Sequence, residues 1–183
     1  FPERYGQWII TALVDVLEGK EVPERIIPSV SPVTRENVQQ LYAAGWFPVI
    51  RKAESAFKIG YGDGLSGISF TDSVTSSLNE VAEQMGVTLV YCDNAYDQEK
   101  TFECADLHVT QGVDAVIYAN WIAGTEQAIS DIYAAAGIPQ MTYDGPHPGA
   151  IAFGPDNFKA GEEAGKFLGN IASDAGWDPA KTA

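Results

Sequence analysis

The stretch GVTLVYCDNAYDQEKTFECADLHVTQGVDAVIY, residues 86–118, decides the fold of this chain. It begins with a mostly apolar run at Val87–Tyr91, continues through a predicted helix at Glu99–Thr110, and ends in a second apolar run at Asp114–Tyr118. Mostly apolar strands on either side of a helix are typical of a parallel sheet that is covered on both faces.

The same alternation continues on both sides of this stretch. A short apolar strand near residues 57–60 precedes a predicted helix at Ser69–Met85, whose apolar residues recur on one face. Beyond the stretch, a helix at Thr125–Ala136 leads to a strand at Ile138–Tyr143. A glycine stands directly after each of these two helices, a position where glycine commonly ends a helix. We therefore predict an α/β fold with a doubly wound parallel sheet.

Both flanks of this core depart from the alternation. On the N-terminal side, one amphipathic helix is predicted at Glu3–Leu17, and Thr34 can cap a short helix at Arg35–Tyr42. Residues 45–56 look like a junction to the core. On the C-terminal side, a Gly/Pro-rich link leads to a short strand and a further helix, predicted at residues 145–149, at Ile151–Phe153 and from Phe158 to about Ala172.

The composition excludes several classes of partner. The chain of 183 residues holds 25 acidic residues against 11 basic ones, a formal net charge of -14. Nucleic acids and anionic membrane surfaces are bound through Lys and Arg, so this balance opposes both and suits a neutral or cationic small ligand. Hydrophobic residues make up 45%, enough for a core. No apolar run approaches the roughly 20 residues of a membrane span, so none is predicted.

The two cysteines, Cys92 and Cys104, stand at the end of a predicted strand and in the helix that follows it. Such elements can approach to the ~5.5 Å Cα spacing that a disulfide needs, so the sequence allows a disulfide or two buried free thiols. A secreted protein would favour the disulfide. Because His108 and His147 complete no ligand spacing, we predict no zinc site, and no cofactor is predicted either.

Ligands in sheets of this kind bind beyond the carboxyl ends of the strands, which singles out a few residues. Trp121 offers a flat apolar face beside the amide of Asn120, a pairing that suits a sugar ring with apolar faces and hydroxyl edges. Asp63 and Asp144 can accept hydrogen bonds from hydroxyl groups. Phe70 can act as a second platform. Both aromatic residues could equally be core positions.

A glycine-rich loop at Gly62–Gly67 supports a different hypothesis. Its spacing, G-x-G-x-x-G between a strand and a helix, is typical of dinucleotide sites. Asp63 opposes this interpretation because it places a negative charge where phosphates would lie, and the predicted helix begins only at Ser69. A nucleotide-dependent enzyme stays as the alternative function. No catalytic arrangement is otherwise visible, so we predict that the chain is not an enzyme.

Three further stretches carry a family pattern. Residues 110–117 read TQGVDAVI, residues 135–139 read AAGIP, and residues 154–161 read GPDNFKAG. In this order and spacing they resemble the type I periplasmic solute-binding proteins of ABC transporters, relatives of the ribose- and galactose-binding proteins. The resemblance covers Phe57–Leu168.

This resemblance implies a protein with two lobes that close on a sugar or related polyol and deliver it to an ABC transporter permease. Such proteins are periplasmic or extracellular, and a lipid anchor on a longer precursor stays open. The family's ligand contacts match Phe70, Thr71, Asn120 and Trp121. The family's usual Asn-Pro pair before the aromatic residue is missing, so the type of sugar stays open. A sensor or regulatory core with the same lobe is a third hypothesis.

The order of the segments is unusual for this family. Residues 1–48 resemble its C-terminal helix and tail, residues 56–150 its first ligand-binding lobe, and residues 151–183 the hinge crossing and first helix of its second lobe. The resemblance therefore implies that the second lobe is largely absent from this chain. A circular permutation, an isolated lobe and joined fragments of a longer protein each account for this order.

Overall fold

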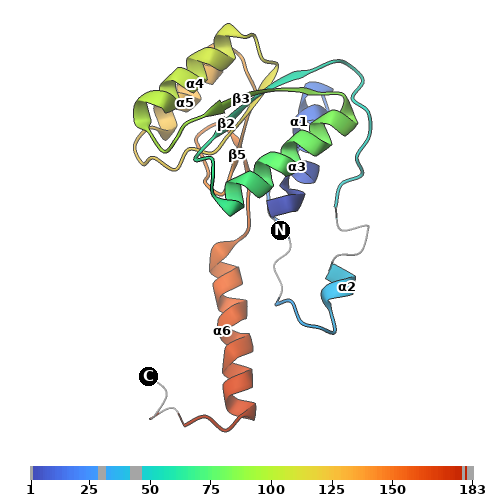
Figure 1. The fold of residues 1–183 in the computed structure, drawn as a ribbon, viewed down its shortest axis with the longest axis vertical. Coiled ribbons are helices and arrows are strands. Elements are labelled where there is room, and N and C mark those ends of the chain that lie inside the picture. Colours follow the sequence, from blue (N-terminus) through green and yellow to red (C-terminus); the bar gives the residue numbers. More distant parts are fainter. Residues whose placement is uncertain (1, 29–31, 42–46, 179, 181–183) are drawn as a thin grey trace. The chain divides into compact units, whose positions relative to one another are not determined.

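The computed structural model describes residues 2–28, 32–41, 47–178 and 180 (Figure 1). These residues belong to two compact units. Unit 1 combines residues 1–26 with residues 47–154, and unit 2 combines residues 27–46 with residues 155–183. The six-stranded sheet lies in unit 1, so this unit carries the candidate site.

The sheet is parallel throughout, with strand order β1-β6-β5-β4-β2-β3. Counted from β2 along the chain, the strands follow the 2-1-3-4-5 order of flavodoxin-like doubly wound sheets, and β1 extends one edge. This order confirms the predicted α/β fold class. The strands are β1 (Arg25–Ile26), β2 (Lys58–Asp63), β3 (Thr88–Asp93), β4 (Ala115–Tyr118), β5 (Gln140–Tyr143) and β6 (Ile151–Phe153).

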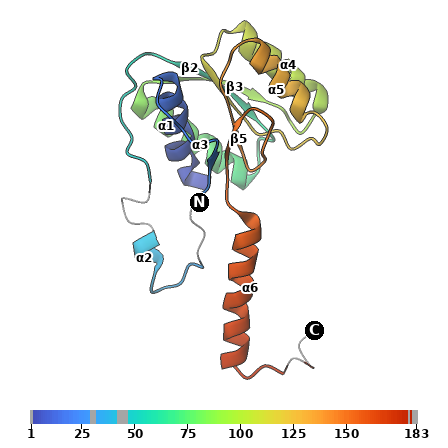
Figure 2. The same cartoon turned by 180° about the vertical axis from the view of Figure 1, so that it is seen from behind.

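Helices cover both faces of the sheet (Figure 1, Figure 2). Successive side chains of a strand point to opposite faces. Ile59 of β2 therefore joins the core beneath α1 and α3, whereas Tyr118 of β4 joins the core beneath α4 and α5. The four helices are α1 (Tyr5–Leu17), α3 (Ser69–Met85), α4 (Gln98–Thr110) and α5 (Glu126–Ala135).

Several elements of unit 1 differ from their predicted bounds, most of them by one or two residues at an end. The predicted helix at Glu3–Leu17 is a 3-10 turn at Pro2–Arg4 followed by α1. Strand β2 continues beyond its predicted end at Gly60, because the next three residues stay paired with β3 as far as Asp63. Pairing on both sides of a central strand outweighs the low strand propensity of glycine and aspartate. Asp63 is therefore fixed by the sheet rather than by a loop.

The described part of unit 2 contains α2 (Val38–Leu41) and α6 (Asn157–Asp174). Helix α2 is shorter than the predicted Arg35–Tyr42, and Tyr42 lies outside the described residues. The Asn37 side chain accepts from the Thr34 amide at 2.7 Å and donates to the Pro32 carbonyl at 2.9 Å, local bonds that compete with a helix. Helix α6 buries none of its side chains.

No helix among the described residues is long and apolar enough to cross a membrane.

Helices α1 and α3 approach so closely at Gly6 that no side chain fits there. The Gly6 amide donates to the Ser77 hydroxyl at 3.0 Å, and a Cβ on Gly6 would collide with the Ser77 backbone carbonyl. Because a carbonyl of a helix cannot move independently, an added methyl group would push the two helices apart. The contact holds α1 against α3.

We expect Gly6→Ala to lower the free energy of unfolding by about 1–3 kcal/mol, the usual cost of overpacking. Urea denaturation followed by circular dichroism measures this change. The matched control is Gly161→Ala in α6, where a new Cβ meets nothing within 4 Å. The control should be neutral or stabilising by about 0.5–1 kcal/mol, because alanine favours helices. Equal effects of the two substitutions would contradict the close contact.

Candidate functional site

The candidate site lies at the carboxyl ends of β2 and β4, where the strand order reverses. Gly62 of β2 is paired with Tyr118 of β4, and Asp63 is paired with Asp93 of β3. The loops that leave these strands therefore begin side by side. The predicted ligand residues all belong to unit 1: Asp63, Phe70, Thr71, Asn120, Trp121 and Asp144.

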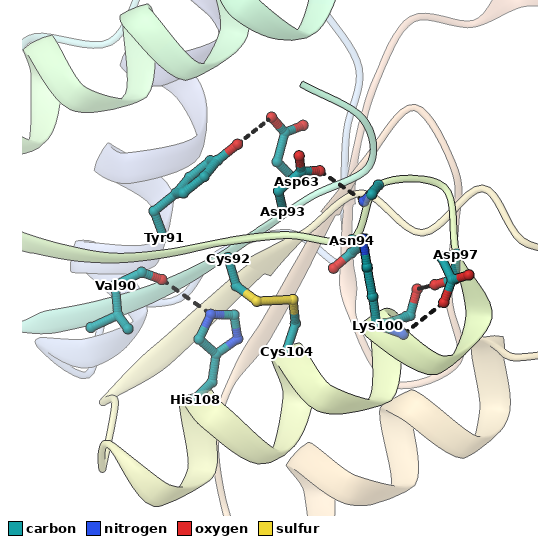
Figure 3. The surroundings of a disulfide bond; sticks show 12 residues. Asp63, Val90, Tyr91, Cys92, Asp93, Asn94, Asp97, Lys100, Cys104 and His108 are labelled. Atoms are coloured by element: carbon teal, nitrogen blue, oxygen red, sulfur yellow. Dashed lines mark hydrogen bonds between the residues drawn. A yellow bond between two sulfur atoms is a disulfide. The ribbon is translucent and has the colours of Figure 1, made fainter. Parts of the chain in front are cut away.

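Asp63 is a buried carboxyl group, 1% exposed, at the end of β2. Its Oδ2 accepts from the Tyr91 hydroxyl at 3.2 Å and from the Thr75 hydroxyl at 3.4 Å, as Figure 3 shows for Tyr91. Its Oδ1 has no partner among the described residues. Burial raises the pKa of Asp63, and the hydrogen bond from Tyr91 opposes this shift. This oxygen is buried, so a ligand hydroxyl can donate to it only where the surrounding loop opens.

A chain of hydroxyl groups connects Asp63 with the end of β5. The Thr75 hydroxyl lies 2.9 Å from the Tyr61 hydroxyl, which lies 3.2 Å from the Tyr143 hydroxyl. When every hydroxyl donates toward the carboxylate, one consistent direction runs from Tyr143 to Asp63. The charge on β2 therefore orients polar groups as far away as β5.

Trp121 and Asn120 follow β4 and have different surroundings. The Trp121 ring packs edge-on against Tyr143, with centroids 6.2 Å apart, and a Cβ on Gly64 would lie 2.8 Å from the Trp121 ring. Glycine at position 64 thus lets the loop after β2 pass close to this ring. The buried Asn120 amide donates to the Thr125 hydroxyl at 2.6 Å and accepts from the Ile122 amide at 3.1 Å. In this arrangement the Asn120 side chain stabilises the loop that it belongs to.

Asp144 is held by a residue that the sequence did not single out. The Tyr5 hydroxyl of α1 lies 3.1 and 3.2 Å from the two carboxylate oxygens of Asp144. Asp144 has a φ of 55°, a left-handed conformation that costs energy for a residue other than glycine. The Tyr5 ring also contacts Phe70 edge-on, with centroids 5.9 Å apart. Tyr5 therefore joins Phe70 and Asp144 in one cluster.

Thr71 stabilises the glycine-rich loop from beneath. Its side chain is fully buried, and its hydroxyl is within hydrogen-bonding distance of the carbonyl groups of Leu65 and Ile68. In this arrangement the hydroxyl is used within the loop. The Thr71 side chain acts on the site by fixing where the loop turns.

The sequence analysis did not identify three residues of the site: Tyr5, Tyr143 and Tyr91. Tyr143 and Tyr91 lie in strands that were treated only as core. Tyr5 lies 139 residues from Asp144, so local spacing gave no signal. The resemblance of residues 1–48 to the family's C-terminal helix and tail was the one signal that could have led to Tyr5.

Both histidines are buried and hydrogen-bonded within the protein. His108 is fully buried between the Tyr133 hydroxyl at 2.9 Å and the Val90 carbonyl at 3.1 Å, and burial lowers its pKa to about 4. His147 is buried beside the Asn120 carbonyl at 3.1 Å, and burial likewise lowers its pKa. Within the described ranges, no group of three or more His, Cys, Asp or Glu residues could hold a metal ion.

The glycine-rich loop does not have the geometry of a phosphate site. Gly62 and Asp63 lie within β2, and α3 starts at Ser69, two residues after the last glycine of the motif. The amides at the start of α3 are therefore separated from the strand end by the loop, and the Asp72 carboxylate already accepts from the Gly67 amide at 3.0 Å. Aromatic faces and carboxyl groups match hydroxyl groups and C–H faces better than phosphates.

We expect Tyr5→Phe to raise the pKa of Asp144 further, because the variant removes the hydrogen bond that lowers it against the effect of burial. A pH titration of the Asp144 carboxyl carbon by NMR measures this. The loss of stability should be about 1.5–3 kcal/mol where Asp144 is ionised, and should shrink as the pH falls through the Asp144 pKa.

Tyr133→Phe is the matched control for this prediction. It removes a buried tyrosine hydroxyl that bonds to His108 instead of to Asp144. The Asp144 pKa should stay at its wild-type value in the control. An unchanged Asp144 pKa in Tyr5→Phe would show that the Tyr5 hydrogen bond does not act on the carboxylate.

A family model described as a periplasmic binding protein domain matches residues 64–176 of this chain. The matched region starts in the glycine-rich loop and includes β3 to β6 and α6. No curated protein sequence matches the chain.

Solved structures with the same fold include sugar complexes. A protein from Mycobacterium smegmatis in complex with β-D-fucofuranose is 24% identical, with a TM-score of 0.57 over 66% of this chain and 41% of that chain. The arabinose-transporter binding protein from Shewanella sp. ANA-3, bound to α- and β-L-arabinofuranose, is 21% identical, with a TM-score of 0.56 over 63% and 40%. A galactofuranose binding protein is 23% identical, with a TM-score of 0.58 over 64% and 42%.

This chain therefore spans 40% to 42% of the length of these solved proteins. At these identities the likeness shows the fold, and it agrees with the strand order of unit 1. The ligand of this chain has to be argued from its own residues.

Proposed function

Since the chain belongs to the periplasmic binding protein family, we propose that it captures a small polar ligand, a sugar or related polyol, for an ABC transporter. The observation that carries this proposal is the combination of aromatic faces and carboxyl groups at one edge of the sheet. Trp121 and Phe70 supply the faces, and Asp63 keeps one carboxyl oxygen without a partner among the described residues. Sugars present apolar ring faces and hydroxyl edges that match these groups.

Each residue has a distinct role in this proposal. Trp121 stacks on the apolar face of the ring, and its position is fixed by Tyr143 on one side and Gly64 on the other. The free Oδ1 of Asp63 accepts a ligand hydroxyl. Asp144 shares its carboxylate between the ligand and Tyr5, so Tyr5 takes part in recognition.

The mechanism we propose is a shift between open and closed arrangements of two lobes. A ligand can favour the closed arrangement only through contacts that the open one lacks. The residues described above form one half of such a site, and unit 1 is the lobe that bears them. A lobe acting alone should bind weakly, because half of the contacts are missing. The family consists of non-enzymatic binding proteins, which agrees with the lack of a catalytic arrangement in the sequence.

The partners follow from this role. The protein would act in the periplasm or outside the cell and pass its ligand to a transporter permease, with a lipid anchor as one way of staying near the membrane. Similar structures hold fucofuranose and arabinofuranose, so five-membered sugar rings belong in the first ligand panel. The disulfide between Cys92 and Cys104 agrees with an oxidising compartment.

We expect titration calorimetry with D-galactose, L-arabinose, D-fucose and glycerol to detect binding of at least one sugar. Trp121→Ala should weaken that binding by about 10-fold or more, because buried aromatic anchors dominate binding energies. The control is Trp177→Ala, which removes an exposed tryptophan beyond α6 and should leave affinity unchanged. A two-lobed protein of confirmed mass that binds none of these ligands would rule out the proposal, and protection by a nucleotide would favour the enzyme alternative.

A further inference from the structure

The segment from the last residue of β3 to the residue before α4, Asp93–Asp97, is enclosed by a disulfide. Cys92, the residue before this segment, is bonded to Cys104 in the middle of α4, with the two Cα atoms 5.6 Å apart. Figure 3 shows the disulfide next to Asp93 and Asn94. The two cysteines are 12 positions apart in the sequence, so the whole segment lies within the ring that the disulfide closes. We call Asp93–Asp97 the stapled loop.

The stapled loop is bonded to the ends of both strands that form the candidate site. The Asn94 amide donates to the Asp63 carbonyl at 2.8 Å, and the Tyr96 amide donates to the Gly64 carbonyl at 2.8 Å. The Asn94 side chain donates to the Ala119 carbonyl, beyond β4, at 3.3 Å. These bonds set the positions of the glycine-rich loop and of the backbone that leads into Trp121.

A side-chain bond adds to these backbone contacts. The Ser66 hydroxyl donates to the Asp93 carboxylate at 2.6 Å, and the other oxygen of Asp93 accepts from the Ala95 amide at 2.7 Å. Ser66 lies at the tip of the glycine-rich loop, so this pair ties the tip to the stapled loop. The tip of the glycine-rich loop and the stapled loop are therefore bonded to each other.

The conformation of the stapled loop is unfavourable by itself. Ala95 has a φ of 51° and Tyr96 a φ of 53°, so two successive residues other than glycine are left-handed. Such residues persist only where the surrounding structure holds them. The Tyr96 side chain is 59% exposed and offers little packing to hold it. The disulfide next to the loop is a covalent restraint, and it helps to stabilise a conformation that side-chain packing stabilises little.

We propose that the Cys92–Cys104 disulfide is a positioning element of the ligand site, which keeps the stapled loop in its left-handed form and makes ligand affinity depend on a dithiol reductant. This inference rests on the proposed function for its effect on affinity, although its effect on the loop is independent of any ligand. With the disulfide intact, Asp93 and Asn94 hold the glycine-rich loop near Trp121. After reduction the loop relaxes, and the fraction of molecules with an assembled site falls.

The redox step is an ordinary thiol–disulfide exchange. A thiolate of the dithiol attacks the sulfur of Cys92, which is only partly buried, whereas Cys104 is 2% exposed. The bond between the two protein sulfurs breaks, and Cys104 leaves as a thiolate that takes up a proton. The second thiol of the reductant then displaces Cys92. Two electrons and two protons pass to the protein, and the dithiol becomes a disulfide.

The first test follows backbone amides in the full chain by hydrogen exchange. Cys92→Ser/Cys104→Ala removes the disulfide without adding a buried hydroxyl at position 104. We expect the Asn94 and Tyr96 amides to exchange faster in this variant, and also in the wild type after reduction with dithiothreitol. Val81→Ala, a cavity in α3 away from the strand ends, is the control for a general loss of stability. Unchanged exchange at Asn94 and Tyr96 would overturn the proposal.

A second variant separates positioning from stability. In the disulfide-free background, Ala95→Gly replaces a strained left-handed residue with one that adopts this conformation freely. We expect it to restore much of the protection of the Tyr96 amide. The same substitution in the oxidised protein should change that protection little, because the disulfide already holds the loop. Failure of Ala95→Gly to restore protection would show that backbone strain does not drive the loop open.

The third measurement is ligand affinity, by calorimetry with the sugars named above. The test sugar is the one that the oxidised wild type binds. We expect the disulfide-free variant to bind this sugar with an affinity about 10-fold lower than that of the oxidised wild type. This ratio corresponds to an assembled site in one molecule of the variant in ten. Val81→Ala should keep its affinity. Equal affinity of oxidised and disulfide-free protein would overturn the positioning role. Absence of sugar binding by the oxidised protein would instead count against the proposed function, while the exchange experiments would still decide the behaviour of the loop.

Discussion

The structure of unit 1 depends on the position of β2 between two parallel neighbours. Its six residues pair with β3 on one side, and four of them pair with β4 on the other. Because all strands are parallel, this pairing brings every carboxyl end to one edge. Gly60 also has to stay small, since a Cβ there would lie 2.7 Å from the buried ring of His108. The site exists because this central strand fits between its neighbours and beneath α4.

The alternation of strands and helices from residue 57 onward could be predicted because burial leaves a periodic trace in the sequence. Helix α3 has the predicted bounds, Ser69–Met85, since an apolar face and a terminal glycine mark it. The end of β2 could not be found in this way, because Gly62 and Asp63 lack the composition of a strand and are held by pairing. The disulfide was left open for a similar reason, as spacing alone does not fix the distance between two sulfur atoms.

The candidate site shows the same limit. Trp121, Phe70, Asp63 and Asp144 could be named because the fold predicts which residues follow the strands. What each side chain does depends on contacts across the molecule. The amide of Asn120 and the hydroxyl of Thr71 are used within their own loops, and the carboxylate of Asp144 is bonded to Tyr5. The types of the residues that follow the strands predicted where the site lies. Which of their polar atoms are available to a ligand depends on long-range packing.

The bond between Tyr5 and Asp144 has a consequence for the order in which the molecule is made. Its two partners are 139 residues apart in the sequence. Strand β1 also pairs with a distant segment, because Arg25 is paired with Ala152 of β6. Contacts of such sequence separation form late, because a long loop must close before they contribute. During synthesis, the N-terminal helix leaves the ribosome well before its partners and must keep its apolar face unpaired. The bond between Tyr5 and Asp144 therefore joins segments that only the completed unit 1 brings together.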